Sequence, residues 1–126
     1  MKVGPQADKF GAFIMKKLRD EAIDYYDGLA RKHWKAPGLQ PLQVALATMT
    51  PEQRAVVRRC IISSVDAALH SFLFGLGEAH DRNEGIAVTV DGKNIVEQSD
   101  GLHGELFGDD GWYGRYSKHG QPSDPA

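Results

Sequence analysis

The spacing of apolar residues changes once along this 126-residue chain, and the change limits the folds open to it. Before residue 78, apolar residues recur every three or four positions, which is the period of an amphipathic helix. Between residues 86 and 97 they alternate, which is the period of a strand with one buried face. A chain of this length forms one core, so helices and strands must share it. The pattern predicts a single α+β domain over residues 1–119 and a flexible C-terminal tail over 120–126.

Three helices are expected in the first part of the chain. The first covers residues 6–34, and a short one follows at 41–49. Thr50, Pro51 and Gln53 then supply an N-cap, a first helical residue and the partner of a capping box. We expect the helix that starts there to be central in the fold and to end at Gly75 and Gly77. The stripe expected on the first helix is Phe10, Ile14, Leu18, Ala22, Tyr25, Leu29 and His33.

The second part of the chain is expected to form a small antiparallel sheet. Residues 86–90 and 94–97 alternate on either side of an Asp91-Gly92 turn, which predicts a hairpin. Residues 102–107 have the spacing of a short helix, and residues 112–117 alternate again as a third strand. The predicted architecture is therefore two long helices and a short one, packed on about three strands with a short inserted helix.

Charge is divided unevenly between the two parts. Through Gly77 there are eleven Lys and Arg against seven Asp and Glu, and from Glu78 onward four against ten. The resulting +4 and −6 describe an electrostatically polar molecule that can steer a charged partner to one end. A pI near 6.2 does not favour nucleic-acid binding.

The location of the protein in the cell is predicted from its apolar segments and its single cysteine. The most apolar stretch, 60–76, contains Asp66 and His70, which are costly in hydrocarbon, so we expect no membrane span. With a single cysteine, Cys60, and no secretory pattern at the N-terminus, we expect a cytoplasmic protein.

Catalytic signals are weak. Asp66 and His70 are four residues apart, which allows a carboxylate to orient an imidazole, but a polar pair at the edge of the core has the same spacing and is favoured. The chain has no nucleophile motif, dinucleotide fingerprint or phosphate loop. We therefore expect no catalytic residues and no cofactor.

A metal site is also not favoured by spacing. HExxH, paired cysteines and the EF-hand pattern are all absent from the sequence. Acidic residues in glycine-rich turns usually cap helices or turn the chain. The residues that could supply oxygen and imidazole ligands are Glu78, His80, Asp81, Glu84, His103, Glu105, Asp109 and Asp110.

Aromatic and acidic residues are mixed near the C-terminus, as in many protein interfaces. An alternative is that Trp112 and Tyr116 cover the buried face of the sheet, with Tyr113 and Arg115 pointing outward. The contact surface predicted from this segment consists of Asp100, Glu105, Asp109, Asp110, Trp112, Tyr113 and Arg115.

Three functional hypotheses follow. The leading one is a cytoplasmic protein-binding module that engages a basic protein, for example an immunity protein that neutralises a toxin domain, by analogy of size and charge. The alternative is a metal-assisted hydrolase that uses His70, His80 or His103 with nearby carboxylates. Compatible with either is a homodimer formed through the first helix, whose stripe includes Tyr25, Tyr26 and Trp34.

Overall fold

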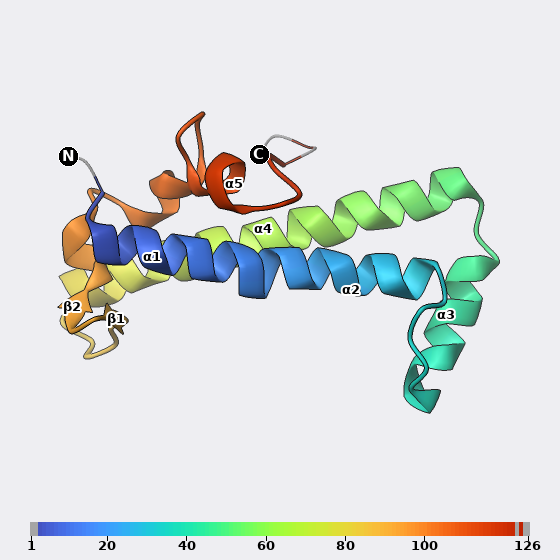
Figure 1. The fold of residues 1–126 in the computed structure, drawn as a ribbon. Helices are drawn as coiled ribbons and strands as arrows, with labels where there is room; N and C mark the ends of the chain where they lie inside the picture. Colours follow the sequence, from blue (N-terminus) through green and yellow to red (C-terminus); the bar gives the residue numbers. More distant parts are fainter. Residues whose placement is uncertain (1–2, 123, 125–126) are drawn as a thin grey trace.

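Two long helical rods lie side by side and carry the rest of the chain (Figure 1). This computed structural model describes residues 3–122 and 124, so the predicted tail at 120–126 lies partly outside the described residues. The first rod joins α1 (Pro5–Ile14), a π-helical segment (Met15–Asp20) and α2 (Glu21–Ala30). The second rod is α4 (Pro51–Asp81). At one end a 3₁₀ turn (Pro37–Leu39) and α3 (Gln40–Ala47) connect the rods.

The first rod is helical as predicted, but its buried face differs from the predicted stripe. The π-helical segment inserts extra chain into the helix, and this rotates the residues that follow. Leu18 is consequently exposed, whereas Arg19 and Asp20 point inward and are buried. The rod ends at Ala30, before the predicted end at residue 34, and Lys32 has a positive φ of 56°.

The start of α4 is as predicted. The Gln53 backbone N–H donates to Thr50 Oγ1 at 3.1 Å, and the Thr50 N–H donates to Gln53 Oε1 at 2.9 Å. The predicted end is wrong, because α4 continues through Gly75 and Gly77 to Asp81. A helical glycine costs only about 1 kcal/mol relative to alanine, and packing along the rod outweighs that cost.

The prediction that α4 is central in the fold is also wrong. Its inward residues, among them Leu69 and Leu73, are buried, but Phe72 and Phe74, which point to opposite flanks of the helix, are each 46% exposed. By length and composition α4 could cross a membrane, although only 22% of its most apolar window is buried in the fold. This helix therefore covers the core with one side and leaves large apolar side chains partly exposed on both flanks.

The predicted hairpin is present but short. β1 (Thr89–Val90) pairs antiparallel with β2 (Lys93–Asn94), with Thr89 opposite Asn94. Asp91 and Gly92 have φ values of 50° and 78°, as a two-residue type I′ turn requires. The chain then forms 3₁₀ turns at Ile95–Gln98 and Leu102–Leu106, the second of which is the predicted short helix.

The predicted third strand is wrong, because Trp112–Tyr116 forms the helix α5. In this turn the Arg115 N–H donates to the Gly111 carbonyl at 3.1 Å. Alternation over five residues does not distinguish a strand from a single helical turn. The fold is α+β as predicted, and its sheet has two strands, not three.

The core has two parts, one at each end of the rods. The smaller, around Tyr26, Leu29 and Leu46, joins α2, α3 and α4. The larger lies where α1 and α4 meet the C-terminal turns. Its buried residues are Ala7, Ile14, Met15, Leu69, Leu73, Leu76, Ile95, Leu102, Leu106, Trp112 and Tyr113.

Candidate functional site

Two residues of the predicted contact surface are inside the protein. Trp112 and Tyr113 are each 1% exposed, so the expectation that Tyr113 points outward is wrong. The Trp112 ring fills the space beside Gly11 of α1, and its Nε1–H donates to Asp8 at 3.1 Å. A surface built from these two rings is not available to a partner.

The carboxylate of Asp66 binds Arg19 and does not orient His70. Arg19 Nε and Nη2 donate to its two oxygens at 2.7 and 3.3 Å. The same guanidinium lies over the ring of Tyr113, 4.5 Å from its centroid. Burial raises the pKa of Tyr113, and the neighbouring carboxylate of Asp66 raises it further, so the phenol stays protonated.

Arg19 also ties the C-terminal segment to the first rod. Its Nη1 donates to Ser117 Oγ at 2.7 Å and to the Gly120 carbonyl at 2.6 Å. Ser117 Oγ in turn donates to Asp20 at 2.5 Å, and Asp20 accepts the Lys118 N–H at 3.0 Å. Arg19 is not among the residues predicted from the sequence, since nothing in its neighbourhood signals a π-helical turn.

The other predicted contact residues are dispersed. Asp109 and Asp110 are exposed in the turn before α5. Glu105 accepts a hydrogen bond from Ser99 Oγ at 2.6 Å, and Arg115 binds Asp8 of α1. Asp100 lies instead at a hollow beside the end of α4.

This hollow has a volume of about 320 Å³, and the carboxylates of Glu78, Asp81 and Asp100 line it. Glu78, His80 and Asp81 come from the last turn of α4, and Asp100 and His103 come from the C-terminal turns. We call it the acidic hollow. Its apolar surface is formed by Leu73, Phe74, Val96 and Leu102.

The backbone adds to the negative potential of the acidic hollow. The last carbonyls of a helix carry a partial negative charge, and α4 ends at Asp81. Arg82 lies 3.5 Å from Glu78 but is largely exposed, so water screens this pair. The rings of Phe74 and His103 pack edge to face with their centroids 5.1 Å apart, which places aromatic rings beside the carboxylates. The hollow is therefore suited to a cation attached to an apolar stem.

A second cavity runs along one side of α4. It has a volume of about 520 Å³ and is mostly apolar, with Ile62, Ser63 and Ala67 on α4 and Phe107 and Tyr113 on the C-terminal segment. We call it the apolar groove.

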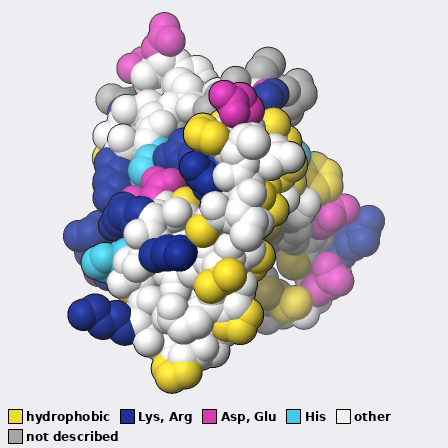
Figure 2. Space-filling view, turned by 90° about the vertical axis from the view of Figure 1, so that its right-hand side faces the viewer, with side chains coloured by type: hydrophobic (Ala, Val, Ile, Leu, Met, Phe, Trp, Pro, Cys, Tyr) yellow, Lys and Arg dark blue, Asp and Glu magenta, His cyan; other side chains and the backbone are white. Residues whose placement is uncertain are grey.

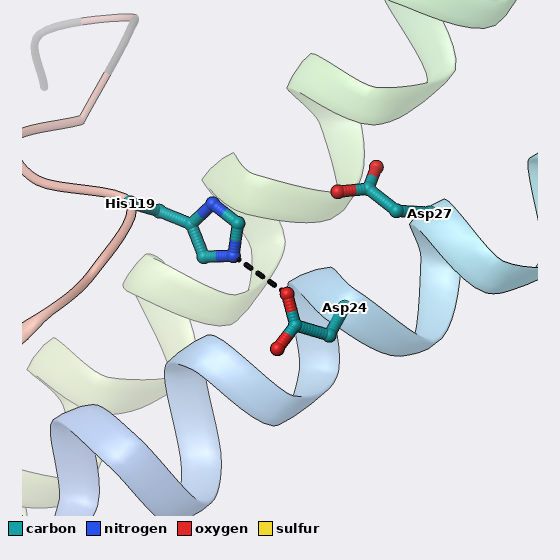
Figure 3. A group of neighbouring side chains, drawn as sticks. All are labelled: Asp24, Asp27 and His119. Atoms are coloured by element: carbon teal, nitrogen blue, oxygen red, sulfur yellow. Dashed lines mark hydrogen bonds and ion pairs between the residues drawn. The ribbon is translucent and has the colours of Figure 1, made fainter.

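A histidine and two carboxylates lie together elsewhere, at Asp24, Asp27 and His119 (Figure 3). Their potential ligand atoms lie within 4.8 Å of one another, the only such group among residues 3–122 and 124. None of His70, His80 and His103, from which the hydrolase hypothesis takes its imidazole, belongs to it.

Cationic side chains already occupy this group. His119 Nε2 lies 2.9 Å from Asp24, and Lys118 Nζ lies 2.6 Å from the other oxygen of Asp24. Arg58 binds both oxygens of Asp27, at 2.8 and 3.1 Å. A hydrogen bond from Lys118 lowers the pKa of Asp24, against a smaller opposing effect of burial. A divalent ion would have to displace two basic side chains, so the group does not fit a metal centre.

Basic and hydrophobic side chains occupy different parts of the surface at one end of the molecule. Figure 2 looks at the end of the molecule that carries α3, where Lys and Arg side chains gather on the left and hydrophobic side chains on the right.

Comparison with known proteins identifies no relative. No protein-family model matches the chain, and neither a curated protein nor a solved structure matches it.

Proposed function

We propose that this chain is a non-enzymatic protein-binding module whose acidic hollow receives a Lys or Arg side chain of a basic partner. The observation that carries the proposal is the acidic hollow itself, in which three carboxylates and a helix C-terminus surround an apolar surface. A partner of this kind is the basic active-site surface of a toxin domain, which an immunity protein would block.

The size of the hollow supports a side chain as its occupant. Its volume of about 320 Å³ is at the small end of the range for small-molecule sites, roughly 300–1,000 Å³. Lys and Arg have apolar stems that pack against surfaces such as those of Phe74 and Leu102, while their charged heads remain near acceptors. The hollow thus offers complementary chemistry to both ends of a basic side chain.

Charge beyond the hollow supports the same class of partner. The chain from Glu78 onward has a net charge of −6, and Asp109 and Asp110 are exposed on it. Such a field raises the association rate of a basic protein and is screened by salt. We therefore expect binding to be fast at low ionic strength and to weaken as salt is added.

The test is selection of binding peptides from a random displayed library, followed by titration of the selected peptides in solution. Selected peptides should carry Lys or Arg beside apolar residues. Asp81→Asn and Asp100→Asn should each weaken binding about tenfold, as expected for loss of a charged acceptor.

Asp91→Asn is the matched control, since it removes the same charge from the hairpin, where Asp91 binds Lys9 outside the hollow. It should leave affinity nearly unchanged. The proposal is contradicted if the selected peptides lack basic residues. It is also contradicted if Asp81→Asn, Asp100→Asn and Asp91→Asn weaken peptide binding equally. A metal-assisted hydrolase binds its metal in the folded state, so zinc or manganese would raise its Tm. We expect no such rise in Tm for this protein.

A further inference from the structure

The apolar groove and the acidic hollow lie on the same side of α4. The α4 residues that line them include positions 63, 67 and 70 in the groove and positions 74, 77 and 81 in the hollow. Successive positions in this series are four or three residues apart, which is the spacing of side chains on one face of a helix. Opposite α4, both concavities are bounded by the C-terminal segment, from Val96 onward. The groove and the hollow therefore follow one another along one line between α4 and that segment.

Four aromatic rings separate the two concavities, and we call them the aromatic wall. His70 and Phe107 line the groove, whereas Phe74 and His103 line the hollow. The ring centroids of His70 and His103 are 5.1 Å apart, and those of His70 and Phe107 are 6.2 Å apart. Phe74 and Phe107 are 46% and 45% exposed, so the wall presents an apolar surface to water. A chain that enters both concavities can therefore pack against the wall as it passes over it.

Charge distinguishes the side chain that suits the groove from the one that suits the hollow. Two carboxylates line the groove, and an arginine of this chain binds each of them. Arg19 Nε lies 2.7 Å from Asp66. Arg59 Nη2 lies 2.5 Å from Asp124. The charges at the groove are thus balanced within the chain, so an uncharged occupant is favoured there, whereas the hollow favours a cation.

The lining of the groove favours an aromatic side chain as this uncharged occupant. The rings of Phe107 and Tyr113 pack edge to face at the groove, with their centroids 5.8 Å apart. A further ring beside them gains from aromatic contact as well as from the area that it buries. The groove has a volume of about 520 Å³ and the hollow about 320 Å³, so the groove accepts the larger side chain. Tyr and Trp are also the residues that most often anchor protein interfaces.

Distance along α4 sets the spacing of the two side chains in a partner. Among the α4 residues that line the concavities, those of the groove centre on Ala67 and those of the hollow on Gly77. At the helical rise of 1.5 Å per residue, these two positions are about 15 Å apart. An extended peptide advances about 3.3 Å per residue and points alternate side chains to one face, so side chains four residues apart lie about 13 Å apart on the same face. The long stem of Lys or Arg covers the remaining distance.

We propose that the partner's binding segment is an extended peptide that seats an aromatic side chain in the apolar groove, crosses the aromatic wall and places a Lys or Arg four residues away in the acidic hollow. This inference rests on the proposed function, to which it adds a second anchor and a spacing. The observation that carries it is the alignment of the two concavities on one face of α4, with the aromatic wall between them. Charge speeds the encounter with any basic protein, whereas two anchors at a fixed spacing select among basic proteins.

The first experiment uses a displayed peptide library in which one position is fixed as Arg and the flanking positions are random. Selection on the wild-type protein should enrich Trp, Tyr or Phe four residues before or after the fixed Arg. Selection on Ala67→Phe, which fills the groove without changing its charge, should not enrich an aromatic residue at that spacing. Ala68→Phe is the matched control, because Ala68 is exposed like Ala67 but lines neither concavity. It should give the same selection as the wild-type protein.

A double-mutant cycle in solution then tests whether the aromatic residue of a selected peptide lies in the groove. Replacing that residue by Ala should weaken binding to the wild-type protein at least tenfold, as for an interface anchor. The same replacement should change binding to Ala67→Phe by less than about twofold, because the groove is already filled. Asp81→Asn should weaken binding of both peptides by the same factor, because the hollow lies about 15 Å from the groove.

The outcomes separate this inference from the proposed function. If Asp81→Asn weakens binding but the selected peptides carry no aromatic residue at the fixed spacing, only the inference is overturned. The same holds if Ala67→Phe and Ala68→Phe bind the peptides equally. If Ala67→Phe abolishes binding and Asp81→Asn leaves it unchanged, or if no peptide is selected, the proposed function is overturned and the inference with it. A dimer that dissociates in Ala67→Phe and persists in Ala68→Phe would assign the groove to a second copy of the chain and would overturn the inference.

Discussion

Replacing Gly11 by alanine should destabilise the protein, although the same change usually strengthens a helix. Gly11 lies in α1, where alanine would be favoured by about 1 kcal/mol from helix propensity alone. A Cβ at this position would lie 2.2 Å from Cε2 of Trp112, whereas carbon atoms in contact are about 3.5–4.0 Å apart. The buried ring would have to withdraw by more than about 1 Å.

The magnitude follows from what that movement disturbs. Forcing extra volume into a packed core costs about 1–3 kcal/mol. Displacing the ring also weakens the Trp112 Nε1–H bond to Asp8, and a hydrogen bond to a charged acceptor contributes about 1.5–3 kcal/mol. After the gain in propensity is subtracted, we expect Gly11→Ala to lower the free energy of unfolding by about 2–4 kcal/mol.

Urea unfolding, followed by circular dichroism, measures this free energy. Gly75→Ala is the matched control: Gly75 is inside α4, and an added Cβ there meets nothing within 4 Å, so it should stabilise by up to about 1 kcal/mol. In the double variant Gly11→Ala/Trp112→Leu the smaller side chain should relieve the clash, and the two effects should be less than additive. A neutral or stabilising Gly11→Ala would refute the packing of α5 against α1.

Two further predictions concern buried and partly buried charges. Arg19→Met should destabilise by about 3–5 kcal/mol, because it leaves the Asp66 carboxylate without its bidentate partner, whereas loss of the exposed Lys17 should cost less than about 1 kcal/mol in the same urea assay. Burial raises the pKa of Asp8, but hydrogen bonds from Tyr116, Trp112 and Arg115, together with the charge of Arg115, outweigh burial and depress the pKa. A depressed folded-state pKa stabilises the fold above the unfolded-state pKa, which is near 4, and this contribution disappears as the pH falls through the folded-state pKa. The urea concentration at the midpoint of unfolding should therefore decrease when the pH is lowered below about 4. The decrease should be less steep in Asp8→Asn than in the wild-type protein.

Local signals predicted the parts of the fold that local interactions decide. The capping box at Thr50 and the Asp91-Gly92 turn each depend on backbone geometry within four residues, and both are present. Such features need no knowledge of what packs against them. The fold class followed from the change in apolar spacing for the same reason.

Features decided by distant contacts were not predictable in the same way. Trp112 reads as a strand residue, but its ring fills the space over Gly11, a residue 101 positions away in the sequence. The inward turn of Arg19 depends on the π-helical segment and on Ser117 and Gly120 at the other end of the chain. A glycine in the middle of an amphipathic helix was the one signal for the first of these contacts, because it marks a close approach.

The position of one helix end determines the candidate site. Had α4 ended at Gly77, Glu78, His80 and Asp81 would lie in a connecting loop, and their side chains would have no fixed relation to Asp100 and His103. Because α4 continues to Asp81, its last turn holds these side chains beside the C-terminal turns and adds the negative end of the helix dipole to them. In the sequence these acidic residues share only their residue type, and the continuation of α4 brings them together in one hollow. Keeping Gly75 and Gly77 helical costs about 1 kcal/mol for each glycine. If Gly75→Ala and Gly77→Ala stabilise the helix without changing affinity for basic peptides, the glycines are tolerated there and are not required by the hollow.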